Sequence, residues 1–522
     1  MVRKPLPCCC QAALFWALNL LRRHFLHRRP KPPSLPGMLQ LDPIPTKPNV
    51  TRLVWWFAFG QGALWFLLPA LLSPNLPPEA IEGLAWGHAW PLGTYKHPPL
   101  QAWLLETAAW LGWRTDAGIY ALNAGCLVLT YWALWRLGNR LMPSSQACMG
   151  VVFMCGCIAF PIATLSSSPD IVLLPLFALC GLQFWRSFTL DLWRDWLILG
   201  ALAGLGLWVK YSFLLMLLSF ALFIVWEPEA RAIVNRTKAW AAVILAVLVF
   251  LPHLNWLLEN HWLPFVYARA QADRVAGEAT GIVTWLRFVG LQLLIMVPVV
   301  FLCWLARENR AFVWPEKTPG SRYLMVLAWA PFVQMALLAL IQGGKPQVLQ
   351  ALALWPFLGL WGAARWGSQW TANIDARRVV MVLMVSAPLV LAYGTWFSIV
   401  PERAAFPRQT LVNQAEILWA QQGWRSPLTI VLGDNRLGGY IAWYSRTRPQ
   451  LMYYGSALYS AGVTDAMVRK QGAVVIWDID RDGEDLPKWA LRHGGVGSKI
   501  TFRIVDKDRG FMVAMGVLAP QE

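Results

Sequence analysis

The chain has 522 residues, of which 57% are hydrophobic and 14% are charged, and its formal net charge is +17. A soluble protein of this size could not bury so much apolar surface, so the composition excludes an ordinary soluble enzyme and predicts a polytopic membrane protein. The positive charge does not indicate nucleic-acid binding, because it is concentrated in residues 1–52, with nine basic residues against Asp42 alone, and in short loops between apolar segments.

The N-terminal residues 1–52 are predicted to form a basic tail on the cytoplasmic membrane surface. The stretch "CCCQAALFWALNLL" is too short to span a membrane. Its basic cluster "RRHFLHRR" follows the apolar run instead of preceding it, which is unlike a signal peptide. An upstream extension, with the protein starting at Met38, is the alternative interpretation.

About eleven apolar stretches are long enough to cross a membrane. They lie at 53–72, 117–137, 147–165, 171–188, 194–209, 212–226, 239–257, 283–305, 323–341, 348–364 and 379–399. With the N-terminus inside, the outside loops hold few basic residues, namely Lys96, Arg114, Lys210, Arg269, Arg274 and Lys345. The remaining loops hold many more, so the positive-inside rule places residues 73–116 and 400–522 outside.

The first outside loop, residues 73–116, contains two amphipathic, tryptophan-rich stretches, "PEAIEGLAWGHAWPLG" and "PPLQAWLLETAAWLGW". Each is too short or too polar to cross a membrane, so both are predicted to be helices lying at the outer membrane–water boundary. Pro98 and Pro99 are expected to start the second helix, where a missing N–H costs nothing.

Residues 400–522 are predicted to form a small α/β domain outside the membrane, after the transmembrane domain of residues 53–399. "PLTIVLGD" and "GAVVIWDID" are typical of buried strands, and "QTLVNQAEILWAQQG" is typical of a helix. "KITFRIVDKDRGFMVAMGV" predicts a hairpin that turns at "DKDRG". No cysteine falls after Cys303, so this region needs no disulfide.

Polar residues gather in the segments that the orientation places outside. They are Glu79, Glu82, His88, Tyr95, Lys96, His97, Asp170, Lys210, Tyr211, His253, Asn255, Glu259, His261 and Lys345. Ionisable groups at the membrane are costly and usually face a polar cavity. Acids and cations together suit a lipid carrier with a phosphate group, because cations hold the phosphate and a carboxylate can deprotonate an attacking hydroxyl.

Each of these residues also has a purely structural interpretation. Glu79 and Glu82 could solvate an exposed helix face, Asp170 could cap a helix, and Lys210 could reach toward lipid headgroups. The histidines show no metal-ligand spacing, and "CGC" at 155–157 falls in a predicted span and is interpreted as buried thiols. The chain contains no Walker loop, nucleophile elbow or glycine-rich dinucleotide turn.

The order of the pieces resembles a known family. An acidic residue opening the first outer loop, then "YKHPPL", "SPD" and "WVKYSFLLM", is similar to the polyprenyl-phosphate-sugar glycosyltransferases with the GT-C membrane fold. The resemblance covers roughly residues 50–400 and is to the glycosyltransferase 39/83 group, which includes protein O-mannosyltransferases and the lipid A aminoarabinose transferase. It implies a polytopic α-helical GT-C domain with a small C-terminal periplasmic α/β domain.

The resemblance also implies roles for individual residues. Glu79 occupies the position of the family's acidic residue, usually Asp, which is the proposed base; Glu82 is the alternative, and Asp170 matches the second acidic position. Lys96, His97 and Lys210 match positions that bind the carrier phosphate, and Lys345 aligns loosely with another. At the position of Lys96 and His97, the aminoarabinose transferase has an acidic residue followed by lysine. Lysine followed by histidine argues against a metal site at this position. A divalent cation nevertheless stays open as a cofactor. Tyr95, Asn255 and His261 are predicted to contact the substrate.

The predicted function is therefore an inverting glycosyl transfer at the outer face of a bacterial inner membrane. The donor is a polyprenyl-phosphate-linked sugar, expected to be undecaprenyl, and the acceptor is a hydroxyl of a lipid, glycan or protein. The alternative class is a transporter or flippase of a lipid-linked or polar solute, which would carry charges near mid-membrane and broken helices in related halves. A non-catalytic membrane subunit is the third interpretation.

Overall fold

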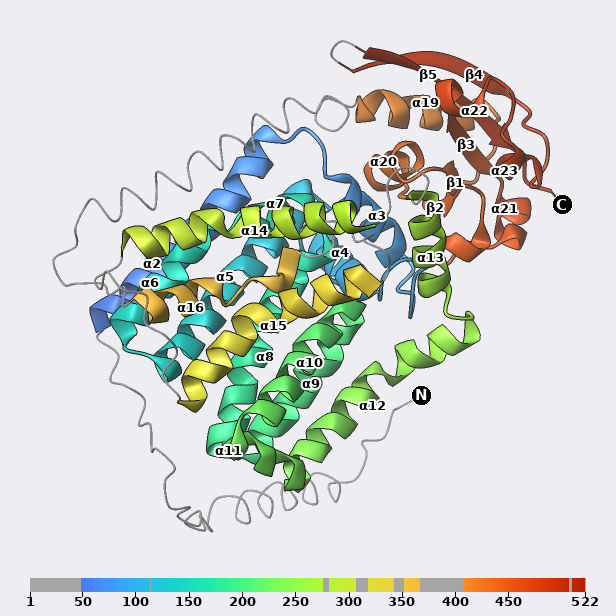
Figure 1. Ribbon diagram of the computed structural model, residues 1–522. Helices are drawn as coiled ribbons and strands as arrows, with labels where there is room; N and C mark the ends of the chain where they lie inside the picture. Colours follow the sequence, from blue (N-terminus) through green and yellow to red (C-terminus); the bar gives the residue numbers. More distant parts are fainter. Residues whose placement is uncertain are drawn as a thin grey trace, which may run out of the picture. The chain divides into compact units, whose positions relative to one another are not determined.

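The computed structural model describes residues 48–112, 114–275, 281–306, 318–341, 352–366, 407–506 and 509–521 (Figure 1). In these residues, six helices are long and apolar enough to cross a membrane. They are α2 (Pro48–Leu72), α5 (Asp116–Leu141), α8 (Pro169–Leu190), α12 (Thr237–Glu259), α14 (Ile282–Leu305) and α15 (Pro319–Ile341). The chain is therefore built mainly of helices, as the composition predicted.

Two further pairs of helices are bent at a short break, and each pair includes a predicted span. The first joins α6 (Ser144–Phe153) and η1 (Met154–Gly156) to α7 (Ala159–Ser166) with a bend of 60°. The second joins η2 (Tyr211–Phe213) and α10 (Leu214–Trp226) to α11 (Pro228–Arg231) and η3 (Ala232–Asn235) with a bend of 109°. Pro228 explains the second bend, because a proline disfavours helical backbone in the residue before it, and Glu227 is extended.

Helices coincide with the other predicted spans wherever the chain is described. The span at 194–209 is α9 (Trp193–Val209), and the described part of 348–364 includes most of α16 (Leu358–Trp366). The predicted tail before Pro48 and the predicted span at 379–399 lie outside the described residues. The number of eleven spans therefore stays a prediction.

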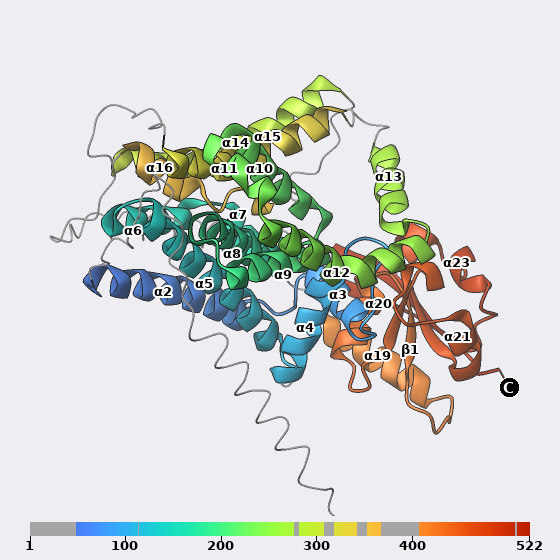
Figure 2. The ribbon, with the colours of Figure 1, turned by 90° about the horizontal axis from the view of Figure 1, so that it is seen from below.

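Helix α9 packs between α8 and α12 (Figure 2). A side chain at Gly200 of α9 would overlap the backbone of Ala242 in α12, so glycine permits the close approach of these two helices. Aromatic side chains fill the core between the helices, and the rings of Phe184 and Phe220 stack with centroids 4.3 Å apart.

Two short helices follow α2, as the tryptophan-rich stretches predicted: α3 (Pro78–Gly87) and α4 (Leu100–Leu111). They pack against each other, and most side chains of α3 are buried. A proline is the N-cap residue of each helix, Pro77 for α3 and Pro99 for α4. A further helix, α13 (Leu263–Val275), follows α12.

The C-terminal residues form an α/β domain (residues 407–521). It is here called the outer domain, after the predicted orientation of the chain. Its helices are α19 (Arg408–Ala420), α20 (Leu437–Tyr444), η5 (Ala457–Tyr459), α21 (Asp465–Gln471), α22 (Ile479–Asp482) and α23 (Lys488–Leu491). Its strands are β1 (Ile430–Gly433), β2 (Gln450–Tyr453), β3 (Ala473–Asp478), β4 (Lys499–Asp506) and β5 (Arg509–Leu518). The predicted helix, both strands and the late hairpin are all present.

The five strands have the order β2-β1-β3-β5-β4. Strands β2, β1 and β3 are parallel, and β5 runs antiparallel to both β3 and β4. The chain passes from β1 to one neighbour and then returns to the other side of β1 as β3. Loops that leave the carboxyl ends of β1 and β3 therefore diverge, and such a switch point is where open α/β sheets bind ligands or partners.

Candidate functional site

Helix α3 carries both acidic residues of the first outer loop. Glu82 is buried, and its carboxylate accepts hydrogen bonds from the Tyr95 hydroxyl at 3.1 Å and from the Asn435 side-chain amide at 2.7 Å. Its second oxygen lies 2.8 Å from the Lys96 ammonium. Glu79, in the first turn of the helix, makes no hydrogen bond or ion pair with any described residue, although its charge acts on Lys96.

The loop between α3 and α4 presents Tyr95, Lys96 and His97 in a tight turn. The Thr94 hydroxyl donates to the His97 carbonyl at 2.7 Å and accepts from the His97 amide at 3.2 Å. Gly93 precedes this turn, and a side chain there would overlap the indole of Trp256 from α12. The turn is therefore fixed by its own side chain and by the helix beside it.

The second acidic position forms a buried ion pair. Asp170, in the first turn of α8, lies 2.9 Å from the ammonium of Lys210, which interrupts the helix after α9 with extended backbone. Ser167, just before α8, has a left-handed backbone with φ of 51°. Its hydroxyl accepts from Asn123 at 2.6 Å and its carbonyl from Gln101 at 2.9 Å, which ties the start of α8 to α4 and α5.

His97 connects the two lysines electrostatically. Burial, together with the charges of Lys96 and Lys210, lowers the pKa of His97 well below its ordinary value, so the imidazole is neutral. Burial also disfavours the charged form of Lys96, but the Glu82 carboxylate outweighs this and raises the pKa of Lys96. The result is a neutral imidazole that feels the charge of two ammonium groups, and each ammonium is paired with a carboxylate.

Tyrosine rings close one side of this cluster. The Tyr95 ring stacks on Tyr453 of the outer domain, with centroids 5.6 Å apart, and meets the edges of Tyr267 from α13 and Tyr459. Burial, and then the nearby Glu82 charge, raise the pKa of Tyr95, so its hydroxyl remains a hydrogen-bond donor.

The structure brings together seven of the residues predicted from the sequence. They are Glu79, Glu82, Tyr95, Lys96, His97, Asp170 and Lys210, and they are here called the acid–lysine cluster. Asn255 is instead exposed on α12, where it donates to Glu259 at 2.6 Å. His261 is exposed just beyond that helix, and Lys345 lies outside the described residues.

Sequence reasoning missed the partners that come from the outer domain and α13. Asn435 lies two residues after β1, and Tyr453 is the last residue of β2. The one available signal was that both lie at the carboxyl ends of parallel strands, which share an edge of the sheet. In the described part of the chain, no three His, Cys, Asp or Glu residues come together as ligands for a metal.

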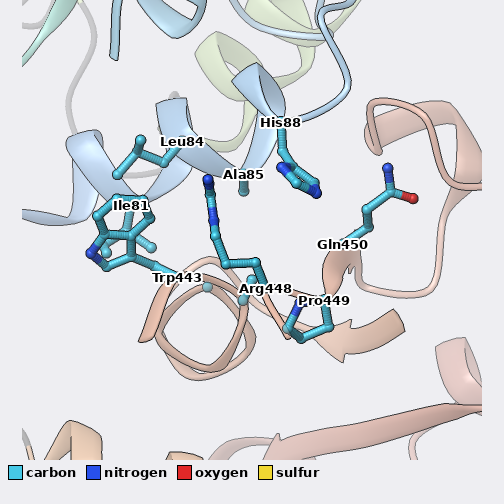
Figure 3. Close-up of a pocket in the computed structure, with 10 residues that line it drawn as sticks. Ile81, Leu84, Ala85, His88, Trp443, Arg448, Pro449 and Gln450 are labelled. Carbon is cyan, nitrogen blue, oxygen red and sulfur yellow. The ribbon is translucent and has the colours of Figure 1, made fainter. Parts of the chain in front are cut away.

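A small pocket lies between α3 and the outer domain (Figure 3). In Figure 3, the Arg448 side chain extends toward α3 between Trp443 and His88. The guanidinium makes a bidentate ion pair with the Glu106 carboxylate of α4, with N–O distances of 2.8 and 2.9 Å. It also lies over the Trp443 ring, 4.7 Å from the ring centroid. Burial alone would raise the pKa of Glu106, but bonds from His88 and Arg448 lower it to about 2.

Several apolar helices and a small C-terminal sheet indicate the class, which is a multi-pass membrane protein with a polar cluster beside its C-terminal α/β domain. The family model described as dolichyl-phosphate-mannose-protein mannosyltransferase matches residues 96–256, which include Lys96, His97, Asp170 and Lys210. The chain is also similar to the lipopolysaccharide core galacturonosyltransferase RgtA of Rhizobium johnstonii. Over 376 residues the two are 24% identical, covering 66% of this chain and 71% of the relative.

The fold matches that of ArnT from Cupriavidus metallidurans, whose crystal structure was solved with undecaprenyl phosphate bound. The TM-score is 0.56 at 14% identity, and the match covers 89% of this chain and 98% of ArnT. Together, the family model, the relative and the solved structure indicate a glycosyltransferase of the GT-C class, as the sequence resemblance implied.

Proposed function

We propose that this protein transfers a sugar from a polyprenyl-phosphate-linked donor to an acceptor hydroxyl, with inversion at the anomeric carbon. The observation that carries the proposal is the acid–lysine cluster, in which Lys96 pairs with Glu82 at 2.8 Å and Lys210 pairs with Asp170 at 2.9 Å. The matched family is described by its dolichyl-phosphate-mannose donor, and ArnT was solved with undecaprenyl phosphate. Both descriptions fit a site whose main task is to hold a lipid phosphate.

The cations would act mainly on the leaving group. As the bond between the anomeric carbon and the phosphate oxygen breaks, negative charge grows on the polyprenyl phosphate. The ammonium groups of Lys96 and Lys210 would stabilise that charge, and His97 would donate a hydrogen bond. Since both lysines are already paired with carboxylates, the phosphate would share them and enter a site with fixed geometry.

Glu79 is the residue best placed to act as the general base. Glu82 accepts from three partners and Asp170 is held by Lys210, so neither is free to take a proton without breaking an ion pair. Glu79 has no such partner among the described residues and lies one helical turn from Glu82. It would remove the proton of the acceptor hydroxyl while that oxygen attacks the anomeric carbon from the face opposite the phosphate.

The proposed location is the outer face of a bacterial inner membrane, with the outer domain in the periplasm. The distribution of lysine and arginine supports this orientation. RgtA is named for the lipopolysaccharide core, which supports a cell-envelope acceptor, and a lipid or glycan hydroxyl fits that description. A polyprenyl-phosphate donor also fits a site without a nucleotide-binding motif.

The test compares purified wild type with Glu79→Gln, Glu82→Gln and Asp170→Asn in nanodiscs. Binding and turnover of a radiolabelled polyprenyl-phosphate sugar are measured separately, and Glu229→Gln on an exposed face of α11 is the control. We expect Glu79→Gln to bind donor normally and to lose roughly 10²–10⁴-fold in turnover. Glu82→Gln and Asp170→Asn should instead weaken donor binding.

Two results would contradict the proposal. Full turnover by Glu79→Gln would remove its role as the base and transfer that role to Glu82 or Asp170. Failure of the wild-type protein to bind any polyprenyl-phosphate sugar would reject the transferase and favour the transporter.

A further inference from the structure

We infer that Asn435 of the outer domain is a positioning residue for the acid–lysine cluster: it orients the Glu82 carboxylate, which in turn holds Lys96 toward the donor phosphate. The inference rests on the proposed function and adds to it a residue that lies outside the segment matched by the family model. It makes the outer domain a part of the site.

The hydrogen bonds of Glu82 divide between its two oxygens. Oε1 accepts from Asn435 at 2.7 Å and from Tyr95 at 3.1 Å, and Oε2 faces Lys96 at 2.8 Å. With Oε1 held by two donors, the carboxylate cannot rotate, so Oε2 has one direction in which to hold the ammonium. Glu82 is only 7% exposed, and a buried carboxylate that loses a donor must move or bind water.

Two hydrogen bonds hold the loop that carries Asn435. The Leu437 amide donates to the Asp434 carboxylate at 2.6 Å, and Arg481, beyond β3, reaches the other oxygen of Asp434 at 3.1 Å. The loop is therefore tied to its own helix and to the neighbouring loop across the switch point. A residue held in this way can orient a partner, which a flexible surface residue could not do.

A second contact fixes the same turn from the same domain. Tyr453, at the end of the neighbouring strand β2, stacks on Tyr95 with an interplanar angle of 13°. Tyr95 is the other donor to Oε1 of Glu82. Both donors to this oxygen thus depend on the carboxyl edge of the outer sheet, one directly and one through ring stacking.

Several charged or titratable groups on the elements near Glu82 affect how the Glu82–Lys96 ion pair depends on pH. They are Glu79 on α3, Tyr95, Lys96 and His97 in the loop, Tyr267 on α13, and Asp434, Tyr453 and Arg481 in the outer domain. Among these, Lys96 makes the ion pair with Glu82. A new negative charge at position 435 would act mainly on Glu82 and, through it, on Lys96.

Asn435→Asp gives a test with a distinctive pH dependence. Two carboxyls in hydrogen-bond contact cannot both ionise easily, so the pair retains one proton above the ordinary carboxyl range. While that proton is present, the new carboxyl donates to Glu82 as the amide did, and the variant should resemble wild type. Once the proton is lost at higher pH, repulsion turns Glu82 away, and KM for donor should rise about tenfold with increasing pH.

Asn435→Ala provides the comparison, since it lacks a donor at every pH and should have a raised KM throughout. Asn413→Asp, on an exposed face of α19 in the same domain, is the matched control and should change neither parameter. A role limited to folding would lower the amount of active protein without a pH-dependent change in KM.

Chemical labelling of Lys96 tests the inference without an activity assay. The rate at which acetic anhydride modifies the Lys96 amine, measured by mass spectrometry, depends on its pKa. In wild type the ion pair keeps this rate low; in Asn435→Ala the loosened pair should raise it several-fold, and in Glu82→Gln further still.

The outcomes separate the two proposals. Unchanged labelling of Lys96 in Asn435→Ala would overturn the positioning role, and so would altered labelling without a change in donor KM. Wild-type protein that transfers no polyprenyl-phosphate sugar would reject the proposed function, whereas the labelling result would still decide whether Asn435 controls Lys96.

Discussion

The ion pair between Arg448 and Glu106 offers the sharpest test of how the outer domain is attached. Moving a carboxyl pKa from its ordinary 4.5 to about 2 corresponds to roughly 3 kcal/mol of stabilisation of the charged form. Arg448→Met removes the guanidinium and leaves Glu106, whose side chain is 12% exposed, without its main partner. The expected cost is therefore roughly 3–5 kcal/mol, the range for breaking a buried ion pair from one side.

The assay is thermal unfolding of the purified protein as a double-mutant cycle. Arg448→Met and Glu106→Leu should each lower the apparent melting temperature by roughly 3–5 °C, whereas the double variant should lose less than the sum, because neither charge is then left alone. The direction in which stability changes with pH follows from the lowered pKa of Glu106. Its contribution is complete above about pH 4.5 and is lost as the pH falls toward about 2. Strictly additive losses would refute the reasoning.

Three further predictions concern the supports of the site. Gly93→Val should push the indole of Trp256 aside and cost roughly 1–3 kcal/mol, measured as a lower melting temperature together with weaker donor binding. Lys210→Met should leave Asp170 buried without its cation, so stability should fall more than in the Asp170→Asn, Lys210→Met double variant, as a melting comparison would reveal. Asp116→Asn should weaken its bond to Arg408 and speed proteolysis of the outer domain by trypsin, while an unchanged cleavage rate would count against this attachment.

Much of the fold could be predicted from the sequence because it depends on local composition. Long apolar runs predict the spans, and the buried runs in residues 400–522 predict β1 and β3. The hydrophobic pattern could not predict where the helix pairs bend. The 109° break between α10 and α11 falls inside a polar turn that reads as an ordinary loop between spans.

The candidate site could be predicted only in part. The stretch "YKHPPL" and the acids of α3 stand close together in sequence, and their resemblance to a family gave each a role. Asn435 reaches Glu82 from 353 positions away and has no local pattern of its own. Pairings of this kind arise from how two regions pack, and a single sequence contains no record of packing. Asn255 and His261 were assigned to the site from their side of the membrane alone, and the structure places both outside the cluster.

Three carboxylates of the first outer loop and its flanking helix take their partners from the outer domain. Glu82 binds Asn435, Glu106 binds Arg448, and Asp116, the first residue of α5, binds Arg408, Trp443 and Tyr444. For chimeras between relatives, this makes residues 79–116 and the outer domain a single unit of exchange. Transplanting one without the other would mismatch all three partnerships at once, so the two segments should be exchanged between relatives only together.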